Sequence, residues 1–169
     1  MSRRSQISIA IATGALVLGV VAQASLVTAK GPDKVLEWDT MIGVPTGLTG
    51  AQSQAPLRGI NGGGVPWTLT EGRGELTVSG HLEIEVDGLV LASTGSNPSA
   101  TFRALVSCVK SDGTFENILT AAFPATTGPA SAGGGDSKIE TNVALPSPCI
   151  APIVFVTSAG GSWFASTGK

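Results

Sequence analysis

Three observations predict an all-β fold, an antiparallel β-sandwich of immunoglobulin-like or jelly-roll-like type. Apolar and polar residues alternate with period two, most clearly between residues 75 and 87. Gly, Pro, Asn and Asp recur between such runs, at the spacing of turns that join short strands. No stretch beyond residue 30 has the periodicity of an amphipathic helix. We therefore expect seven to nine short strands.

Residues 1–29 have the three-part layout of a secretory signal peptide. Arg3 and Arg4 provide a basic start, residues 7–21 are apolar or small, and small-x-small sites favour cleavage after Ala24 or Ala29. An apolar run of about 15 residues is short for a bilayer span, although an uncleaved membrane anchor is the alternative. The paired arginines also resemble a twin-arginine export signal. We expect a secreted protein, extracellular or in the bacterial cell envelope, with no stable membrane span after cleavage.

The charge of the exported part excludes one class of partner. The chain has 10 basic and 12 acidic residues, and the signal carries two of the basic ones. Eight basic against twelve acidic residues leave a formal charge of −4. Nucleic-acid binding requires clustered Lys and Arg, and no basic stripe exists in the sequence. The remaining length fits one domain with its own hydrophobic core.

Cys108 and Cys149 are the two cysteines. An exported chain meets an oxidising compartment, so one disulfide between them is the simplest expectation. It would close a loop of about 40 residues and stabilise the fold by a few kcal/mol. Two free buried thiols or a metal pair are the alternatives. One His and two Cys are too few for a typical metal site, so we expect no metal and no cofactor.

The exported part divides into an irregular arm and a β-sandwich domain. Residues 30–55 are rich in Gly, Thr, Ser and Pro and are expected to form the arm, with a short strand or helical turn at residues 34–38. Residues 56–169 are expected to form the domain, with loops at residues 92–100 and 126–136. After the patterned hairpin, strands are expected at residues 101–109, 115–123, 138–145, 150–157 and 163–165.

The alternation between residues 75 and 87 also predicts a hairpin register. Leu76, Val78, Leu82, Ile84 and Val86 share the apolar face. Directly opposed residues share a face, so a three-residue loop at residues 79–81 would pair Val78 with Leu82. The same register sets residue 73 opposite 87 and residue 75 opposite 85. Residues 87–88 mark either a turn or a bulge within one long strand.

The stretch Arg58 to Trp67, RGINGGGVPW, is the most unusual local sequence. Its three consecutive glycines invite comparison with phosphate-binding loops. Such loops need a Lys and a Ser or Thr after the last glycine, followed by a helix, whereas Gly64 is followed by Val65-Pro66-Trp67 and a strand. The glycines are therefore expected to allow a close-packed bend, and the proline to start an extended segment that delivers the Trp into the core.

The carboxylate face of the hairpin is the candidate for catalysis. Glu75, Glu83, Glu85 and Asp87 lie on one side, and a glycosidase-type hydrolase needs two carboxyl groups in different environments within a cleft. The polar side of an ordinary sheet has the same pattern. His81 is expected at the hairpin tip, where a histidine is far more often a turn residue than a general base. No residue is therefore assigned as catalytic.

Aromatic residues offer the alternative of ligand binding. Trp67 and Trp163 occupy strand positions and are expected in the core, whereas Trp38 lies in the arm and is expected to be exposed. Arg58 and Asn61, beside the bare glycine backbone, complete a weak candidate ligand-binding set with Trp38 and Trp67. The ligand would be a cell-surface glycan or a protein.

Two segments carry a resemblance to known proteins. Residues 59–67 (GINGGGVPW) and 85–91 (EVDGLVL) resemble an uncharacterised family of secreted bacterial proteins with a G-I/V-N-G/A-G-G-x-P-W segment. The resemblance implies export and a bacterial source, and it implies no activity and no catalytic residues.

The hypothesis that follows is a secreted, non-enzymatic β-sandwich that acts as a binding or surface-associated structural module. The alternative is a small secreted hydrolase that uses the carboxylate face. A third hypothesis is a repeating surface subunit that pairs sheet edges through residues 30–54.

Overall fold

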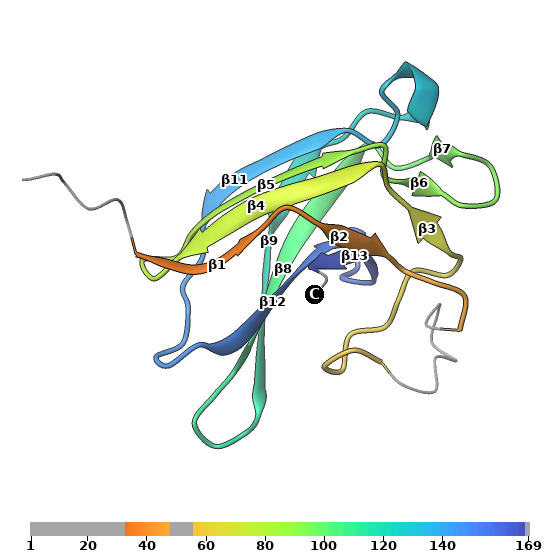
Figure 1. The fold of residues 1–169 in the computed structure, drawn as a ribbon. Coiled ribbons are helices and arrows are strands. Elements are labelled where there is room, and N and C mark those ends of the chain that lie inside the picture. The colour runs from red at the N-terminus through yellow and green to blue at the C-terminus, as the bar shows by residue number, and fades with distance from the viewer. Residues whose placement is uncertain (1–32, 48–55, 168–169) are drawn as a thin grey trace, which may run out of the picture.

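A computed structural model describes residues 33–47 and 56–167. The predicted signal peptide, both of its cleavage sites and much of the predicted arm lie outside these residues. The described chain is almost entirely β-structure (Figure 1), with one short 3-10 turn, Ala130–Ala132. Its thirteen strands are β1 (Lys34–Trp38), β2 (Met41–Gly43), β3 (Trp67–Thr68), β4 (Glu71–Thr77), β5 (His81–Asp87), β6 (Val90–Leu91), β7 (Ser96–Asn97), β8 (Thr101–Val109), β9 (Phe115–Pro124), β10 (Gly128–Pro129), β11 (Ser137–Asn142), β12 (Ile150–Thr157) and β13 (Trp163–Thr167).

The strands form three antiparallel sheets. A four-stranded sheet has the order β1-β4-β5-β11, and a five-stranded sheet has the order β2-β13-β12-β8-β9. A small sheet, β10-β7-β6-β3, lies at one end of the molecule (Figure 1). Eight strands have five or more residues, and the other five have two or three. The predicted all-β sandwich with one disulfide is confirmed.

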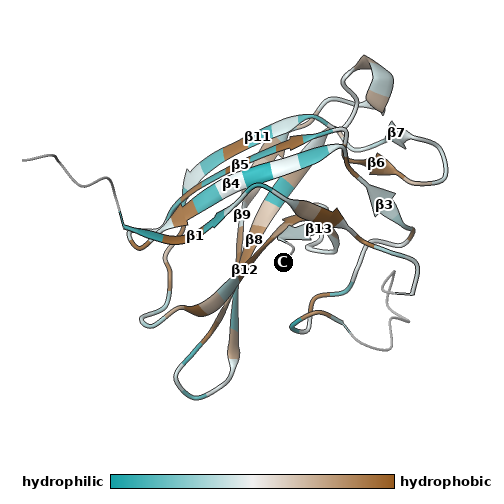
Figure 2. Ribbon diagram, viewed as in Figure 1, coloured by the Kyte–Doolittle hydropathy of each residue, from teal (hydrophilic) through white to brown (hydrophobic). Residues whose placement is uncertain are grey.

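The main core fills the space between the two larger sheets. Alternate residues of β5 and β8 point inward, and the side chains of Leu82, Ile84, Val86 and Val106 are fully buried. Figure 2 shows this alternation as hydrophilic and hydrophobic bands along β4, β5 and β11. Strand β8 lies between β12 and β9, and residues on both of its faces are buried.

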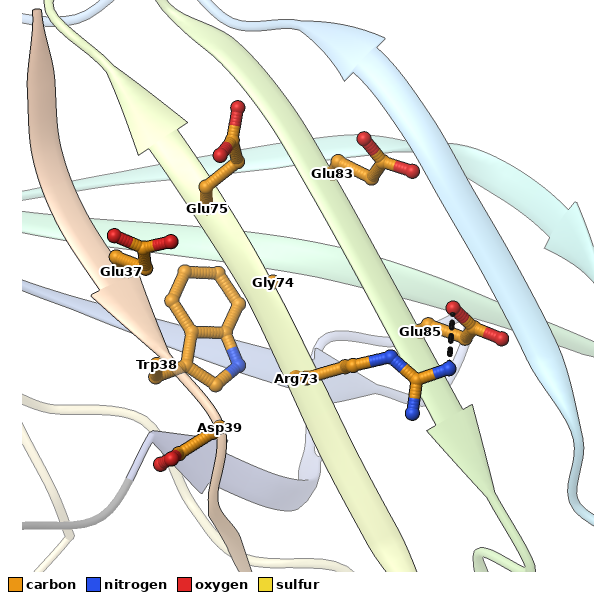
Figure 3. Close-up of a pocket in the computed structure, with 8 residues that line it drawn as sticks. All are labelled: Glu37, Trp38, Asp39, Arg73, Gly74, Glu75, Glu83 and Glu85. Carbon is orange, nitrogen blue, oxygen red and sulfur yellow. Dashed lines mark ion pairs between the residues drawn. The ribbon is translucent and has the colours of Figure 1, made fainter.

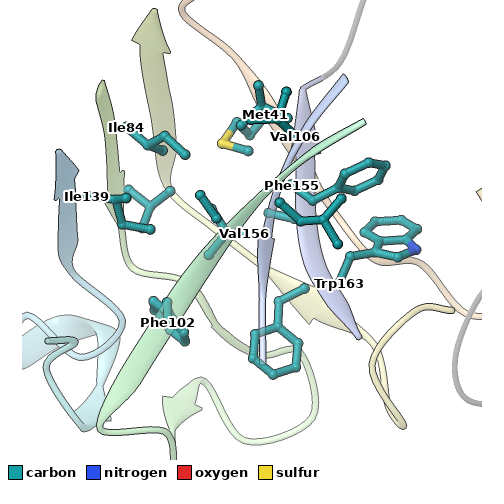
Figure 4. Packing of buried hydrophobic residues seen from close by; sticks show 14 of the residues in the cluster. Met41, Ile84, Phe102, Val106, Ile139, Phe155, Val156 and Trp163 are labelled. Carbon is teal, nitrogen blue, oxygen red and sulfur yellow. The ribbon is translucent and has the colours of Figure 1, made fainter. Parts of the chain in front are cut away.

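A second apolar layer lies on the other face of the five-stranded sheet. Figure 4 shows Phe155 and Trp163 on the side of that sheet away from Ile84 and Ile139. The RGINGGG segment lies against this layer, because the Gly63 amide donates to the Trp163 carbonyl at 2.8 Å and the Trp163 amide donates to the Asn61 carbonyl at 3.0 Å. This segment therefore pairs with β13 at Trp163, through a parallel bridge at Gly62.

The glycine run acts as the close-packed bend that the sequence predicted. A Cβ atom on Gly63 would lie 2.9 Å from Cδ1 of Phe164 and 3.1 Å from Nε1 of Trp67. Trp67 itself is 6% exposed and stacks on Phe164, with ring centroids 3.9 Å apart. The prediction that Trp67 is delivered into the core is confirmed, as is the core position of Trp163.

The predicted arm is corrected in its described part. Residues 34–38 form β1, which pairs with β4, and residues 41–43 form β2, which pairs with β13. The Trp67 carbonyl oxygen lies 2.3 Å from the position of a Cβ on Gly43, so the absence of a side chain there permits a close backbone approach. The strand expected as one alternative for residues 34–38 is therefore present, and residues 41–43 belong to a main sheet instead of an irregular arm.

The register predicted for the β4–β5 hairpin is wrong by two residues, although the faces are right. Leu76 pairs with Leu82 and Glu75 with Glu83, so the three-residue loop is Val78-Ser79-Gly80. Val78 lies in the turn and is 62% exposed. The position of Gly80 explains the difference, because it has a φ of 87° and occupies the third loop position, which requires a left-handed residue. His81 accordingly begins β5 instead of lying at the tip.

The small sheet contains short strands within segments that were expected to be loops. Strand β5 of the four-stranded sheet ends at Asp87, and β6 of the small sheet begins at Val90. Asp87-Gly88 therefore lies where the chain passes from one sheet to the other and is not a bulge within one strand. The expected loops at residues 92–100 and 126–136 contain β7 and β10, which pair with each other. Residues 111–113 form the turn between the two strands expected at residues 101–109 and 115–123, with Gly113 at a φ of 81°.

Cys108 and Cys149 form the predicted disulfide, with a sequence separation of 41 residues. It joins β8 to the segment that leads into β12. No described residue is a free cysteine. Within the described chain, no helix is long and apolar enough to cross a membrane.

Candidate functional site

The outer surface of the four-stranded sheet gathers most of the acidic side chains. We call this surface the acidic face. Period-two alternation places every second residue of β4 and β5 on it, and pairing with β1 and β11 adds more. Nine carboxylates lie on the sheet or at its border, namely Glu37, Asp39, Glu71, Glu75, Glu83, Glu85, Asp87, Asp136 and Glu140, with three cations, namely Lys34, Arg73 and Lys138.

Nine negative against three positive charges give this face a formal surplus of six negative charges. The other charged residues that the structure describes balance one another, three acidic (Asp33, Asp112, Glu116) against three basic (Arg58, Arg103, Lys110). The acidic excess of the described chain is therefore concentrated on one side of the molecule. Such an arrangement produces a negative potential that attracts cationic partners.

Each of the three cations bridges two carboxylates along the sheet. Lys34 Nζ lies 2.6 Å from Glu37 and 2.8 Å from Glu75, and Arg73 contacts Glu71 and lies 2.8 Å from Glu85. Lys138 Nζ lies 2.9 Å from Glu83 and 3.5 Å from Glu140. These pairs are solvent-exposed, so each contributes little to stability. Their effect is to hold the carboxylates in a fixed lateral array.

Two adjoining hollows lie on the acidic face. The first, of about 540 Å³, is lined by Glu37, Trp38, Asp39, Arg73, Gly74, Glu75, Glu83 and Glu85 (Figure 3). The second, of about 400 Å³, is lined by Glu85, Asp87, Pro124, Ala125, Thr126, Asp136, Ser137 and Lys138. Glu85 lines both, so the two hollows lie on either side of this side chain.

Trp38 and Gly74 shape the first hollow. They are cross-strand partners, and a Cβ atom on Gly74 would lie 2.6 Å from Cζ2 of Trp38 and 2.2 Å from the Glu83 carbonyl oxygen. The indole therefore occupies the space above the glycine, as Figure 3 shows. Trp38 is 7% exposed, so the expectation that its side chain is exposed to solvent is wrong. Its Nε1 has no hydrogen-bond partner among the described residues.

The acidic groups of the two hollows differ in their pKa. Hydrogen bonding to Lys138 lowers the pKa of Glu83 below its usual range. Burial raises the pKa of Asp87, and the neighbouring carboxylates of Asp136 and Glu85 add to this effect. Asp136 is held by a hydrogen bond of 2.9 Å that the Gly88 amide donates to its Oδ1. No group of three or more His, Cys, Asp or Glu within residues 33–47 and 56–167 has the arrangement of a metal site.

The opposite pKa directions of Asp87 and Asp112 predict opposite pH effects on stability. Asp87 has a raised pKa in the fold, so its charged form destabilises the protein as pH rises above its usual pKa of about 4. Replacement by Asn is expected to raise the melting temperature at pH 7 by about 1 °C, the screened effect of a half-exposed group, and to have no effect near pH 3.

Asp112 provides the matched comparison. Hydrogen bonds from Thr114 lower its pKa, so its contribution is present above its usual pKa and is lost as pH falls through the lowered value. Asp112→Asn is expected to lower the melting temperature at pH 7 and to approach the wild type in acid. Thermal melts between about pH 3 and pH 8 measure both variants. Equal signs for the two variants at pH 7 would contradict this assignment.

The four residues predicted to bind a ligand do not meet in one place. Trp38 lines the first hollow, and Trp67 lies in the core. Arg58 and Asn61 belong to the segment on the far side of the five-stranded sheet. Asn61 is exposed there, and its backbone carbonyl accepts the bond from Trp163. A ligand-binding role for these residues stays a prediction.

The side chain and the carbonyl of Arg58 are engaged in contacts within the chain. Its guanidinium donates to the Ser107 carbonyl at 2.9 Å and to the Ala151 carbonyl at 2.6 Å, and lies 5.5 Å from the ring centroid of Phe115. Its carbonyl accepts a hydrogen bond from Asn117 Nδ2, and burial lowers its pKa. These contacts tie the segment to β8, β9 and β12 next to the register shift between residues 150 and 153.

Sequence reasoning found part of the acidic face and missed the rest. The shared face of Glu75, Glu83, Glu85 and Asp87 is confirmed by the β4–β5 register. Glu37 and Asp39 were missed because residues 30–55 were expected to be irregular. Lys138 and Glu140 alternate with a core residue, Ile139, which was a signal for the exposed side of β11.

The molecule thus belongs to the class of disulfide-linked, antiparallel all-β proteins with one strongly acidic sheet face. No protein-family model, no curated protein and no solved structure matches the chain. The resemblance of residues 59–67 and 85–91 to secreted bacterial proteins therefore stays a prediction.

Proposed function

We propose that the protein is a secreted, non-enzymatic binding module that uses its acidic face to hold a cationic partner, namely a Lys- and Arg-rich protein surface. The observation that carries this proposal is the surplus of six negative charges on one sheet, while the remaining described charges balance. The two adjoining hollows on that surface provide space for Lys and Arg side chains of the partner. The negative potential would accelerate association and make it sensitive to ionic strength.

A cationic partner is favoured over a glycan by the burial of the tryptophans. Glycan-binding β-sandwiches stack sugars on exposed aromatic faces, whereas Trp38, Trp67 and Trp163 are 7%, 6% and 2% exposed. The first hollow offers the edge of one buried indole and an array of carboxylates. Carboxylates fixed in position form charge-assisted hydrogen bonds with guanidinium and ammonium groups.

Binding is favoured over hydrolysis by the distribution of the carboxylates. A glycosidase places its acid and its second carboxyl group around one bond, with their pKa values separated. Here Glu75 and Glu83 line the first hollow, whereas Asp87, whose pKa is raised, lines the second. Glu75 and Glu83 are moreover ion-paired with Lys34 and Lys138. Hydrolysis of a polysaccharide that is abolished in Asp87→Asn would favour the hydrolase alternative.

Export is part of the proposal. The disulfide between Cys108 and Cys149 fits an oxidising compartment, and the signal-like residues 1–29 provide a route to one. The resemblance to secreted bacterial proteins supports the same destination.

Charge reversal tests the acidic face directly. Glu37→Lys/Asp39→Lys changes two exposed side chains at the first hollow, and Asp112→Lys/Glu116→Lys makes the same change in net charge on the β8–β9 hairpin. Binding of polylysine is measured by titration calorimetry, with residues 30–169 as the protein, which include every described residue. The first variant is expected to bind at least about tenfold more weakly, which corresponds to about 1.4 kcal/mol.

The hairpin variant is expected to stay within about threefold of the wild type, because its substitutions lie outside the acidic face and surface charges are screened beyond about 8 Å at physiological salt. Equal losses in the two variants would show that polylysine senses net charge alone. That result, or unchanged affinity in the first variant, would contradict the proposal.

A further inference from the structure

The five-stranded sheet ends in a long edge strand, β9. The C-terminal end of β9 is tied to the chain around β11. Ser137 Oγ donates to the Pro124 carbonyl at 2.8 Å, and the Thr126 amide donates to the Asp136 carbonyl at 3.0 Å. The other half, residues 115–119, lies on the part of the β8–β9 hairpin that protrudes from the molecule (Figure 1). This half offers an edge for pairing with another strand.

The composition of this edge differs from that of the other outer strands. Edge strands are normally protected from pairing by Lys and other charges, by Pro or by short length. Strand β1 carries Lys34 and Glu37, β11 carries Lys138 and Glu140, and β2 has three residues. Residues 115–119 of β9 carry one charge, on Glu116, and two exposed apolar side chains. Phe115 is 52% exposed and Leu119 is 39% exposed.

The two apolar side chains lie on the same face of the sheet. Phe115 pairs with Val109, Asn117 with Ser107, and Leu119 with Leu105, so residues 115, 117 and 119 point to the outer side. Glu116 and Ile118 point to the inner side. The outer-side pattern, apolar-amide-apolar, reads the same in both directions and is therefore self-complementary in an antiparallel pair.

The charge pattern selects one register for pairing with a second copy. A two-fold axis at Glu116 would oppose two carboxylates, which is unfavourable. An axis at Ile118 would extend the pairing into the irregular part of β9, where the register with β8 shifts between Arg103 and Leu105. An axis at Asn117 sets Phe115 opposite Leu119 of the other copy and Glu116 opposite Ile118. It joins apolar groups and opposes no like charges.

We propose that residues 115–119 of β9 pair antiparallel with the same residues of a second copy, about a two-fold axis at Asn117. The pairing joins two five-stranded sheets into one continuous sheet across the dimer. Arg58 remains compatible with it, because its guanidinium lies over Phe115 within its own chain. The edge pairing expected of residues 30–54 is assigned to β9 instead, since β1 carries Lys34 and Glu37 and β2 has three residues.

The length of the paired segment sets the strength of the dimer. Five residues per strand and two apolar pairs bury less surface than the roughly 1,200–2,000 Å² of a stable interface. The dimer is accordingly weak, with a dissociation constant in the micromolar to millimolar range. It forms where the local concentration is high.

Sedimentation equilibrium over a concentration series tests the dimer. Residues 30–169 are expected to pass from monomer towards dimer as the concentration rises from about 5 µM to about 1 mM, the range in which interfaces of small area associate. Leu119→Lys places a charge at the edge and is expected to keep the protein monomeric throughout. The matched control is Val78→Lys, at a 62% exposed apolar position in the β4–β5 turn, which is expected to dimerise like the wild type.

A cysteine cross-link tests the register. Residues opposed at a two-fold axis have Cα atoms about 4.5–5.5 Å apart, within the range that a disulfide spans. Asn117→Cys is therefore expected to form a covalent dimer on mild oxidation, much faster than Val78→Cys. Circular dichroism confirms that each variant is folded. A wild type that stays monomeric up to about 1 mM, a dimer that persists in Leu119→Lys, or equal cross-linking of the two cysteine variants would overturn the proposal.

Discussion

Trp67→Ala is expected to destabilise the protein by about 3–5 kcal/mol, a large part of the 5–15 kcal/mol that stabilises a typical domain. The indole is 6% exposed, stacks on Phe164 at 3.9 Å and meets Phe102 edge-on at 6.4 Å. Its removal leaves a cavity beside Phe102 and Phe164 and takes away two ring contacts, each worth about 0.5–1.5 kcal/mol beyond burial. Urea denaturation followed by circular dichroism measures the loss.

A conservative variant separates packing from a specific role of the indole. Trp67→Phe keeps a ring on Phe164 and is expected to lose less than half as much stability as Trp67→Ala. Both variants are expected to bind polylysine like the wild type once folded, because Trp67 does not line the acidic hollows. A loss below about 1 kcal/mol for Trp67→Ala would contradict its place in the core.

The bend before Trp67 shows what the sequence could predict locally. Three glycines followed by Val-Pro-Trp predicted a close backbone approach and an inward tryptophan, and both are confirmed at Gly63 and Trp67. What the glycines pack against could not be read from the sequence. The segment pairs with Trp163 at the start of β13, about a hundred residues further along the chain, and contacts over such separations leave no local pattern.

The β4–β5 hairpin shows why faces were easier to predict than register. Alternation fixes which side chains share a face, and a shift of two residues leaves that assignment unchanged. The choice between registers depended on Gly80, whose left-handed backbone marks the third loop position. Its amide donates to the Thr77 carbonyl, and its carbonyl accepts from the Val143 amide, which belongs to a distant segment. The apolar side chain of Val78 favours a place in the strand, whereas Gly80, two residues later, puts Val78 in the turn.

Which carboxylates meet on the acidic face depends on the order of the strands in the sheet. The alternation of apolar and polar residues along a strand does not reveal that order. The four carboxylates of the hairpin were predictable from two adjacent strands. The first hollow also needs Glu37 and Asp39, brought beside β4 by β1, and the second needs Asp136, brought beside β5 by the start of β11. The burial of Trp38 has the same origin, because its cross-strand partner is a glycine that leaves room for the indole.

Replacement of both Cys108 and Cys149 by Ala is expected to lower the free energy of unfolding by about 4 kcal/mol, from the chain entropy of a closed loop of about 40 residues. The bond encloses β9, β10 and β11, and its anchor on β8 is a fully buried residue. Without it, the unfolded chain gains freedom that the native contacts must offset. Urea denaturation of the oxidised wild type and of the double variant measures the difference.

Reduction of the wild type distinguishes the two contributions to this loss. The reduced protein loses the loop constraint and keeps both sulfur atoms in place, whereas Cys108→Ala also leaves a small cavity in the core. The reduced wild type is therefore expected to lie between the oxidised wild type and the double variant in stability. Hydrogen exchange should then rise most at the start of β12, where Arg58 and the disulfide together hold the register shift against β8. Unchanged exchange there, with a loss of stability spread evenly over β4 and β5, would show that the bond acts on the unfolded chain alone.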